Sequence, residues 1–226
     1  MSVEVEARRE ASVWRRGWIL VTRALMLELR IYASIGRFIA RRPAIAPGAA
    51  GFGYHKPVLT VLIIFIGLSA VEIPIVDLIV HRWPAVRIAF LVLGIWGVTW
   101  MFGLLCAYLM RPHTVGPDGI RVRHGLEVDL PFSWDDIASV EHRRRVDEPK
   151  SPRFDETVRQ DQEGLDASRT LVYRMQDATD IEIELERPIA VRLPGGGANG
   201  GEQTITGVRI WVDDPRAFMD EVRKHL

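Results

Sequence analysis

Twenty-three consecutive uncharged residues lie between Arg87 and Arg111. As an α-helix this segment is roughly 35 Å long, enough to cross the roughly 30 Å hydrocarbon core of a bilayer. A second apolar segment begins with fourteen uncharged residues, 57–70. The sequence therefore predicts a transmembrane hairpin over 57–110, with one helix over about 57–79 and another over about 88–110.

The orientation of this hairpin follows from its short connection and from the basic residues around it. Because only about five to eight residues separate the two helices, both chain ends must lie on the same side. Within about twenty positions of the helices, basic residues are more frequent on that side than in the connecting loop. They are Arg37, Arg41, Arg42, Lys56, Arg111, Arg121 and Arg123 on the side of the termini, against Arg82 and Arg87 in the loop. We expect a multi-pass protein of the cell (inner) membrane with both termini cytoplasmic, and arginines in the first hydrophobic stretch argue against a signal peptide.

The N-terminal segment, 1–56, contains an apolar stretch with regularly spaced arginines. Over about 14–42 they recur at intervals of seven, as Arg16, Arg23, Arg30 and Arg37. On a helix this spacing drifts by only about 20° per step, so the arginines form one basic stripe. An arginine at the centre of a membrane span costs about 2.5–3.5 kcal/mol, which favours a helix lying in the interface. The alternatives are a helix packed on the C-terminal domain, or a third span that would place the N-terminus outside.

Formal charges are distributed unevenly although the whole chain is neutral. Residues 1–56 hold ten Lys/Arg and four Asp/Glu, whereas 111–226 hold seventeen and twenty-three. Nucleic-acid binding is therefore disfavoured, because it needs a concentrated basic face. The single cysteine, Cys106, excludes an intramolecular disulfide and a cysteine-based zinc site. No cofactor is predicted, and His113, His124 and His142 have no metal-ligand spacing.

After Arg111 the hydrophobic period changes to two, which predicts antiparallel strands. Asp214 and Pro215 provide the start of a C-terminal helix, with Phe218, Val222 and Leu226 on one face. We expect a cytoplasmic α+β domain over 111–226, an antiparallel barrel or sandwich closed by that helix. The charged segment 145–169 has few aliphatic residues and is expected to be a mobile insertion. The glycine-rich segment 195–201 lacks the residues of a phosphate-binding loop and is expected to connect two strands.

Two stretches of this domain resemble a known family. They are HTVGPDGIRVRHGLEVDLPFSWDDIASVEHR and IWVDDPRAFMDEVRKHL, and the likeness extends over residues 113–145 and 171–226. The turn, the strand with its glycines, the WDDI turn and the final DPxxF helix resemble bacterial pleckstrin-homology-like (PH-like) domains. Small membrane proteins with a two-helix hairpin before such a domain have a similar architecture. These are scaffold motifs, so the resemblance implies a fold rather than an activity.

Two groups of charged residues are candidate sites. Arg143, Arg144 and Arg145, with Arg121 and Arg123 on a nearby strand, are predicted to contact anionic lipid headgroups. The alternative is a solvated strand end whose arginines pair with acids of the insertion. Glu72 and Asp77 are acids in the hairpin, for which a proton or cation relay and a hydrated position near the outer interface are the two interpretations. No nucleophile, nucleotide motif or catalytic carboxylate pair is found.

The sequence therefore predicts a membrane-anchored interaction module without catalytic activity. Its domain would bind lipid headgroups, a partner protein or another copy of the chain. The alternatives are a small transport or channel subunit that uses Glu72 and Asp77, and a regulatory subunit of a larger membrane enzyme.

Overall fold

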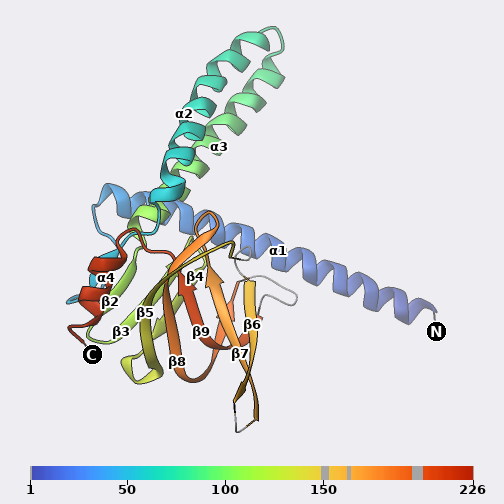
Figure 1. Ribbon diagram of the computed structural model, residues 1–226. Helices are drawn as coiled ribbons and strands as arrows, with labels where there is room; N and C mark the ends of the chain where they lie inside the picture. Colours follow the sequence, from blue (N-terminus) through green and yellow to red (C-terminus); the bar gives the residue numbers. More distant parts are fainter. Residues whose placement is uncertain (1, 149–152, 162–163, 195–200, 226) are drawn as a thin grey trace.

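The computed structural model describes the chain except residues 1, 149–152, 162–163, 195–200 and 226. It has three parts, which are a long N-terminal helix, a helical hairpin and a sheet domain (Figure 1). The hairpin projects from one end of the sheet domain, and the N-terminal helix passes the base of the hairpin and extends to the side (Figure 1).

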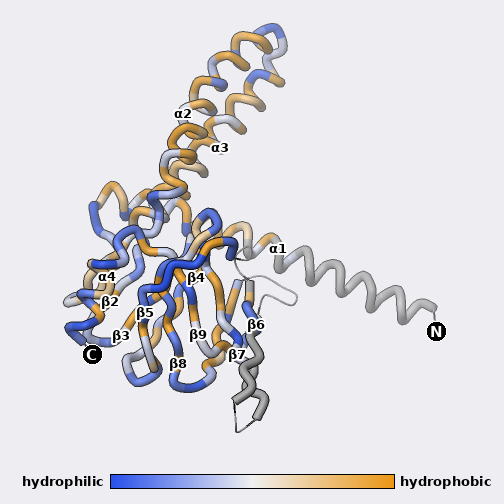
Figure 2. The backbone as a smooth tube through the Cα atoms, in the orientation of Figure 1, coloured by the Kyte–Doolittle hydropathy of each residue, from blue (hydrophilic) through white to orange (hydrophobic). Residues whose placement is uncertain are grey.

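Three helices precede the sheet domain. They are α1 (Ser2–Ile39), α2 (Lys56–Ile79) and α3 (Pro84–Met110). The helix expected over 14–42 thus begins earlier, and the two hairpin helices form close to their predicted limits. Both hairpin helices are long and apolar enough to cross a membrane, and Figure 2 shows apolar residues along most of their length.

The hairpin helices are not the core of a water-soluble fold. No residue of α2 is buried, and in α3 only Gly103, Cys106 and Ala107 are buried, in two helices that the structure describes completely. Large apolar side chains such as Leu68, Leu78 and Ile88 are therefore exposed along the hairpin. An exposed apolar surface of this extent indicates association with a membrane.

The sheet domain consists of two sheets. The first has the order β1-β2-β3-β4, formed by β1 (Ala50–Phe52), β2 (His113–Gly116), β3 (Gly119–His124) and β4 (Val128–Phe132). A 3-10 turn, η1 (Trp134–Asp136), leads into the second sheet. Its order is β5-β8-β9-β7-β6, formed by β5 (Ile137–Val146), β6 (Arg153–Asp161), β7 (Gly164–Tyr173), β8 (Ala178–Leu193) and β9 (Gly201–Ile210).

Two expectations about these sheets are corrected. The second sheet is mixed rather than antiparallel, because β7 pairs in parallel with β9. The chain reverses direction at each end of β8, so β7 and β9 run in the same direction. These two strands lie side by side in the sheet, and their pairing is therefore parallel. The segment 145–169 is also not a loop in its described part, since β6 pairs with β7 from Arg153↔Val172 to Asp161↔Gly164. This polar segment pairs with β7 at the edge of the sheet, where a strand does not need to be buried on both faces.

The two sheets curl around one hydrophobic core, and α4 (Pro215–Val222) closes one end (Figure 1). The Asp214 carboxylate accepts a hydrogen bond from the Ala217 N–H at 3.0 Å, which confirms the predicted helix start. Phe218 and Val222 are fully buried against the sheets, whereas the predicted third position, Leu226, lies outside the described residues. The domain also includes β1, which precedes the hairpin in the sequence and pairs with β2 as an edge strand.

Candidate functional site

The base of the hairpin is built around a close contact between α1 and α3. A Cβ atom at Gly103 would lie 2.2 Å from the Ile31 side chain, so only glycine allows α1 to pack at this level. Ile31 is fully buried with Ala107 and with Leu126, which lies in the turn between β3 and β4. Three parts of the chain therefore meet at one point, namely α1, the C-terminal part of α3 and the first sheet.

Beside this contact lies a cavity of about 450 Å³, which we term the arginine pocket. Five arginines line it, from α1, from the end of α3 and from β3. They are Arg30, Arg37, Arg111, Arg121 and Arg123. Ala33, Ser34, Ala44, Leu126, Glu127 and Asp129 complete the lining.

Backbone carbonyls hold three of these arginines in place. Arg30 donates to the Leu126 carbonyl at 3.2 Å. Arg111 donates to the same carbonyl and to that of Gly125. Arg123 is buried and donates to the carbonyls of Ala44 and Pro112. These bonds fix the guanidinium groups without neutralising them, because a carbonyl carries no net charge.

One carboxylate is shared by three of the guanidinium groups. Asp129 accepts from Arg121 at 2.5 Å and from Arg123 at 3.3 Å, and Arg111 lies 3.7 Å away. Burial alone would raise the pKa of Asp129, but the hydrogen bond from Arg121 and the charge of Arg123 hold this pKa below its usual value. Burial lowers the pKa of Arg111, and the charges of Arg123 and Arg30 lower it further. With five arginines and two acids in its lining, the pocket has an excess of positive charge.

The pocket unites residues that the sequence placed in two separate groups. Arg30 and Arg37 come from the predicted basic stripe, and Arg121 and Arg123 come from the predicted headgroup contact. The side chains of Arg16 and Arg23, the other two members of the stripe, lie outside the described residues. Sequence reasoning missed Arg111 and Asp129 as site residues. The signal for Arg111 was its position as the first charge after the apolar run.

Arg143, Arg144 and Arg145 do not join this pocket, because β5 belongs to the second sheet. Arg145 pairs with Glu182 at 3.0 Å, and the Arg144 guanidinium lies 5.9 Å from the centre of the Trp211 ring. Arg143 lines a different, polar cavity of about 360 Å³. The buried Arg209 in that cavity is surrounded by Glu148 at 2.8 Å, Asp155 at 2.5 Å and Glu182 at 3.3 Å. The arginines of this second cavity are thus balanced by carboxylates.

The two acids of the hairpin have different surroundings. Asp77 forms a two-point ion pair with Arg87 across the hairpin, at 2.5 and 2.8 Å. Glu72 lines a groove of about 330 Å³ between α2 and α3, next to Ser69 and Gly94. Within the described part of the chain, no hydrogen bond or ion pair of the Glu72 carboxylate is found.

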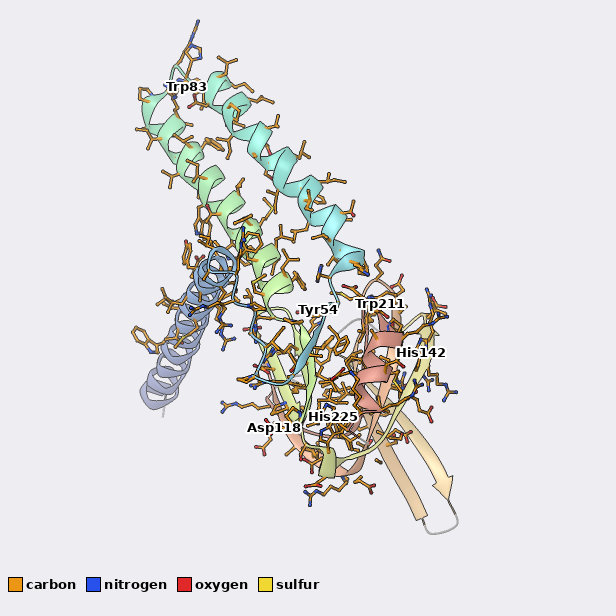
Figure 3. All side chains as sticks on the ribbon, turned by 90° about the vertical axis from the view of Figure 1, so that its left-hand side faces the viewer. Tyr54, Trp83, Asp118, His142, Trp211 and His225 are labelled. Atoms are coloured by element: carbon orange, nitrogen blue, oxygen red, sulfur yellow. The ribbon has the colours of Figure 1, made fainter. Side chains whose placement is uncertain are left out.

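Aromatic side chains join the hairpin base to the sheet domain (Figure 3). The buried Tyr54 packs on Tyr108 of α3 and on both His113 and His124. His124 also stacks on Tyr173 of the second sheet, with ring centres 5.1 Å apart. The Tyr54 hydroxyl accepts a hydrogen bond from the Gly125 N–H. Burial raises the pKa of this hydroxyl. This cluster links the helices to both sheets.

Burial keeps both histidines of this cluster neutral. It lowers the pKa of His113 to about 3 and that of His124 to about 4. His113 Nδ1 accepts from the Arg123 N–H at 3.1 Å, and Nε2 lies 3.2 Å from the Trp211 carbonyl. These partners assign the proton to Nε2. His142, by contrast, is exposed on β5 (Figure 3). Among the described residues no group of His, Cys, Asp and Glu side chains could hold a metal ion.

Asp213, just after β9, ties α2 to the sheet domain. Its carboxylate accepts from the backbone N–H groups of His55 and Lys56 at 3.1 Å, and its own N–H donates to the Gly53 carbonyl at 2.8 Å. It thereby satisfies N–H groups at the start of α2 that have no partner within the helix. The direction of the hairpin is set by this contact at α2 and by the arginine pocket at α3.

Comparison of the chain with protein-family models, with curated proteins and with solved structures gave no match. The resemblance to PH-like domains therefore rests on the sequence motifs and stays a prediction.

Proposed function

We propose that this protein is a membrane-anchored interaction module without catalytic activity. In this proposal α2 and α3 cross the cell (inner) membrane, α1 lies on its cytoplasmic face, and both termini are cytoplasmic. The sheet domain, for which we propose a PH-like fold, binds lipid headgroups, a partner protein or another copy of the chain. The observation that carries the proposal is an exposed apolar hairpin attached through buried contacts to a folded domain.

The position of α1 supports an interfacial location. From Pro84 to the crossing at Gly103, α3 is roughly 28 Å long, close to the thickness of the hydrocarbon core. A helix that crosses α3 at Gly103 would therefore lie at the boundary between hydrocarbon and headgroups.

The faces of α1 support the same location. An exposed apolar stripe runs along the helix, formed by Trp18, Val21, Leu25, Leu29, Tyr32 and Ile39. At 3.6 residues per turn this stripe lies roughly 130° around the helix from Arg30 and Arg37. Because these arginines face the sheet domain, the apolar stripe faces away from it. Such a helix is typical of the membrane interface, with apolar residues in the bilayer and arginines towards the headgroups.

Cysteine labelling of cells that express the full-length protein tests this topology. In a Cys106→Ala background, one variant has His81→Cys at the tip of the hairpin and a matched one has Asp118→Cys in the exposed turn between β2 and β3. A membrane-impermeant maleimide is applied from outside the cell membrane. We expect it to label the tip cysteine in intact cells or spheroplasts, and the Asp118→Cys protein only after lysis.

One control accompanies the labelling. Carbonate washing of the membranes should leave the protein in the pellet, because two spans resist extraction. Labelling of both cysteines from the same side, or release by carbonate, would contradict the proposed anchor.

A further inference from the structure

We infer that the arginine pocket binds a phosphate group, and that its position at the hairpin base favours the phosphate of an anionic lipid headgroup. The preference for a lipid rests on the proposed function, because it requires the pocket to lie at the membrane surface. The binding of phosphate itself requires only the pocket.

The first support is the imbalance of charge in the pocket. The five arginines face only two carboxylates, Asp129 and Glu127, and Glu127 is exposed. Asp129 already contacts three guanidinium groups. A doubly or singly charged anion would offset part of the remaining positive charge, and the balanced cavity around Arg209 has no such need.

The second support is the supply of hydrogen-bond donors. A guanidinium group has five N–H donors in a planar fork that matches two phosphate oxygens. In the described part of the chain, Arg37 forms no side-chain hydrogen bond or ion pair, and the bonds of Arg123 use only Nε and Nη1. Arg111 and Arg123 are held by backbone carbonyls, so their donors are already oriented before a ligand arrives.

The third support is the place of the pocket in the molecule. Arg111 directly follows the last residue of α3, and Arg30 and Arg37 lie on α1, the helix proposed to lie in the interface. The pocket would therefore be level with the phosphates of the cytoplasmic leaflet. Its volume of about 450 Å³ is within the range of small-ligand sites.

Binding is measured with the purified full-length protein in uncharged maltoside micelles. The probes are dihexanoyl phosphatidic acid, dihexanoyl phosphatidylglycerol, dihexanoyl phosphatidylcholine, glycerol 3-phosphate and inorganic phosphate. We expect the two anionic lipids to bind about tenfold or more tightly than phosphatidylcholine, whose choline cancels the phosphate charge. Anionic lipids that bind no better than phosphatidylcholine would overturn the inference.

The soluble probes separate the two sources of phosphate. Weaker binding of glycerol 3-phosphate and inorganic phosphate than of phosphatidic acid supports a lipid ligand. Equal affinity would support a phosphate site for small solutes and overturn the preference for lipid. This outcome is independent of the labelling experiment, so the phosphate site can stand even where the proposed topology fails.

A matched pair of double variants localises the site. Arg37→Gln with Arg121→Gln removes two exposed pocket arginines, whereas Arg143→Gln with Arg144→Gln removes two exposed arginines of β5. Both variants lose the same charge. We expect the first to weaken binding of phosphatidic acid about tenfold or more and the second to change it less than about twofold. An equal loss in both variants would show unspecific attraction and overturn the inference, as would no loss in the pocket variant.

A third variant separates binding from structural support. Asp129→Asn removes the carboxylate that contacts three arginines, so it is expected to lower thermal stability and at the same time to strengthen phosphate binding. A purely structural pocket would lose stability without any gain in affinity, which would contradict the inference.

Discussion

Asp213 accepts hydrogen bonds from two backbone N–H groups at the start of α2, and its neighbour Asp214 caps α4. We predict that Asp213→Ala and Asp214→Ala each lower the free energy of unfolding by about 1–2 kcal/mol, because each leaves helix N–H groups without a partner. Hydrogen exchange distinguishes the two losses. Asp213→Ala should speed exchange at His55 and Lys56, and Asp214→Ala should speed it at Ala217. Unchanged exchange at His55 and Lys56 would mean that Asp213 does not hold α2.

These adjacent residues also show what single positions in a sequence can predict. The role of Asp214 follows from local pattern, because an acid before proline is a common helix start. The role of Asp213 does not, since its partners at the start of α2 are 158 and 157 positions away. The same holds for Asp129, whose role depends on Arg111 at the end of α3.

At the scale of elements, the packing of α1 on α3 depends on Gly103. We predict that Gly103→Ala displaces α1 and lowers the free energy of unfolding by about 1–3 kcal/mol, because its Cβ would overlap Ile31. Gly97→Ala is the matched control, since a Cβ there meets no atom within 4 Å and the better helix propensity of alanine remains. Thermal unfolding in micelles measures both. Equal unfolding temperatures for the two variants would refute a close contact at Gly103.

Strands with one buried face were predictable from the sequence, and strands at the edges were not. Alternation identified β3, β4 and both halves of β8, where Ile181, Ile183, Val191 and Leu193 are buried. The two halves join into one strand with a shift of register between Glu184 and Ile189. By contrast β1 has only three residues, and β6 is mostly polar. Both lie at sheet edges, where pairing with a neighbour determines the strand and hydrophobic period does not.

At the scale of the whole molecule, stability should depend on pH between 7.5 and 5. His113 and His124 have pKa values of about 3 and 4 in the folded chain, below the ordinary value of about 6.5. The unfolded chain therefore binds more protons as the pH falls, which destabilises the fold by roughly 2 kcal/mol per histidine at pH 5. Burial raises the pKa of Asp180 to about 6, which acts in the opposite direction by roughly 1.4 kcal/mol. We predict a net loss of roughly 2–3 kcal/mol.

Unfolding temperatures at pH 7.5 and 5 measure this loss. His124→Phe should remove a substantial part of it, since phenylalanine keeps the stacking on Tyr54 and Tyr173 without a titrating group. His142→Gln is the control, because His142 is exposed on β5. A wild-type protein equally stable at both pH values, or a full pH response in His124→Phe, would contradict the prediction.

The arginine pocket illustrates how a site emerges only in the complete fold. Its members lie between positions 30 and 129 of the chain and come from α1, from the residue that follows α3, from strands β3 and β4 and from connecting segments. Regular spacing indicated Arg30 and Arg37, and strand pattern indicated Arg121 and Arg123. Their convergence required the turn at Leu126 to pack against both α1 and α3, a contact for which the sequence has no local signal.

The crossing of α1 and α3 at Gly103 has a consequence for the choice of membrane. On the proposed topology α1 lies on the membrane surface and limits how far the hairpin can enter the bilayer. The part of the hairpin beyond the crossing at Gly103 therefore has a fixed hydrophobic length. In a bilayer thicker or thinner than this length, mismatch costs a fraction of a kcal/mol per ångström and is relieved by tilting the hairpin or by deforming the lipid. Since the sheet domain is fastened to both helices, tilt would also turn the arginine pocket relative to the headgroup layer. Bilayer thickness would then regulate access to the pocket.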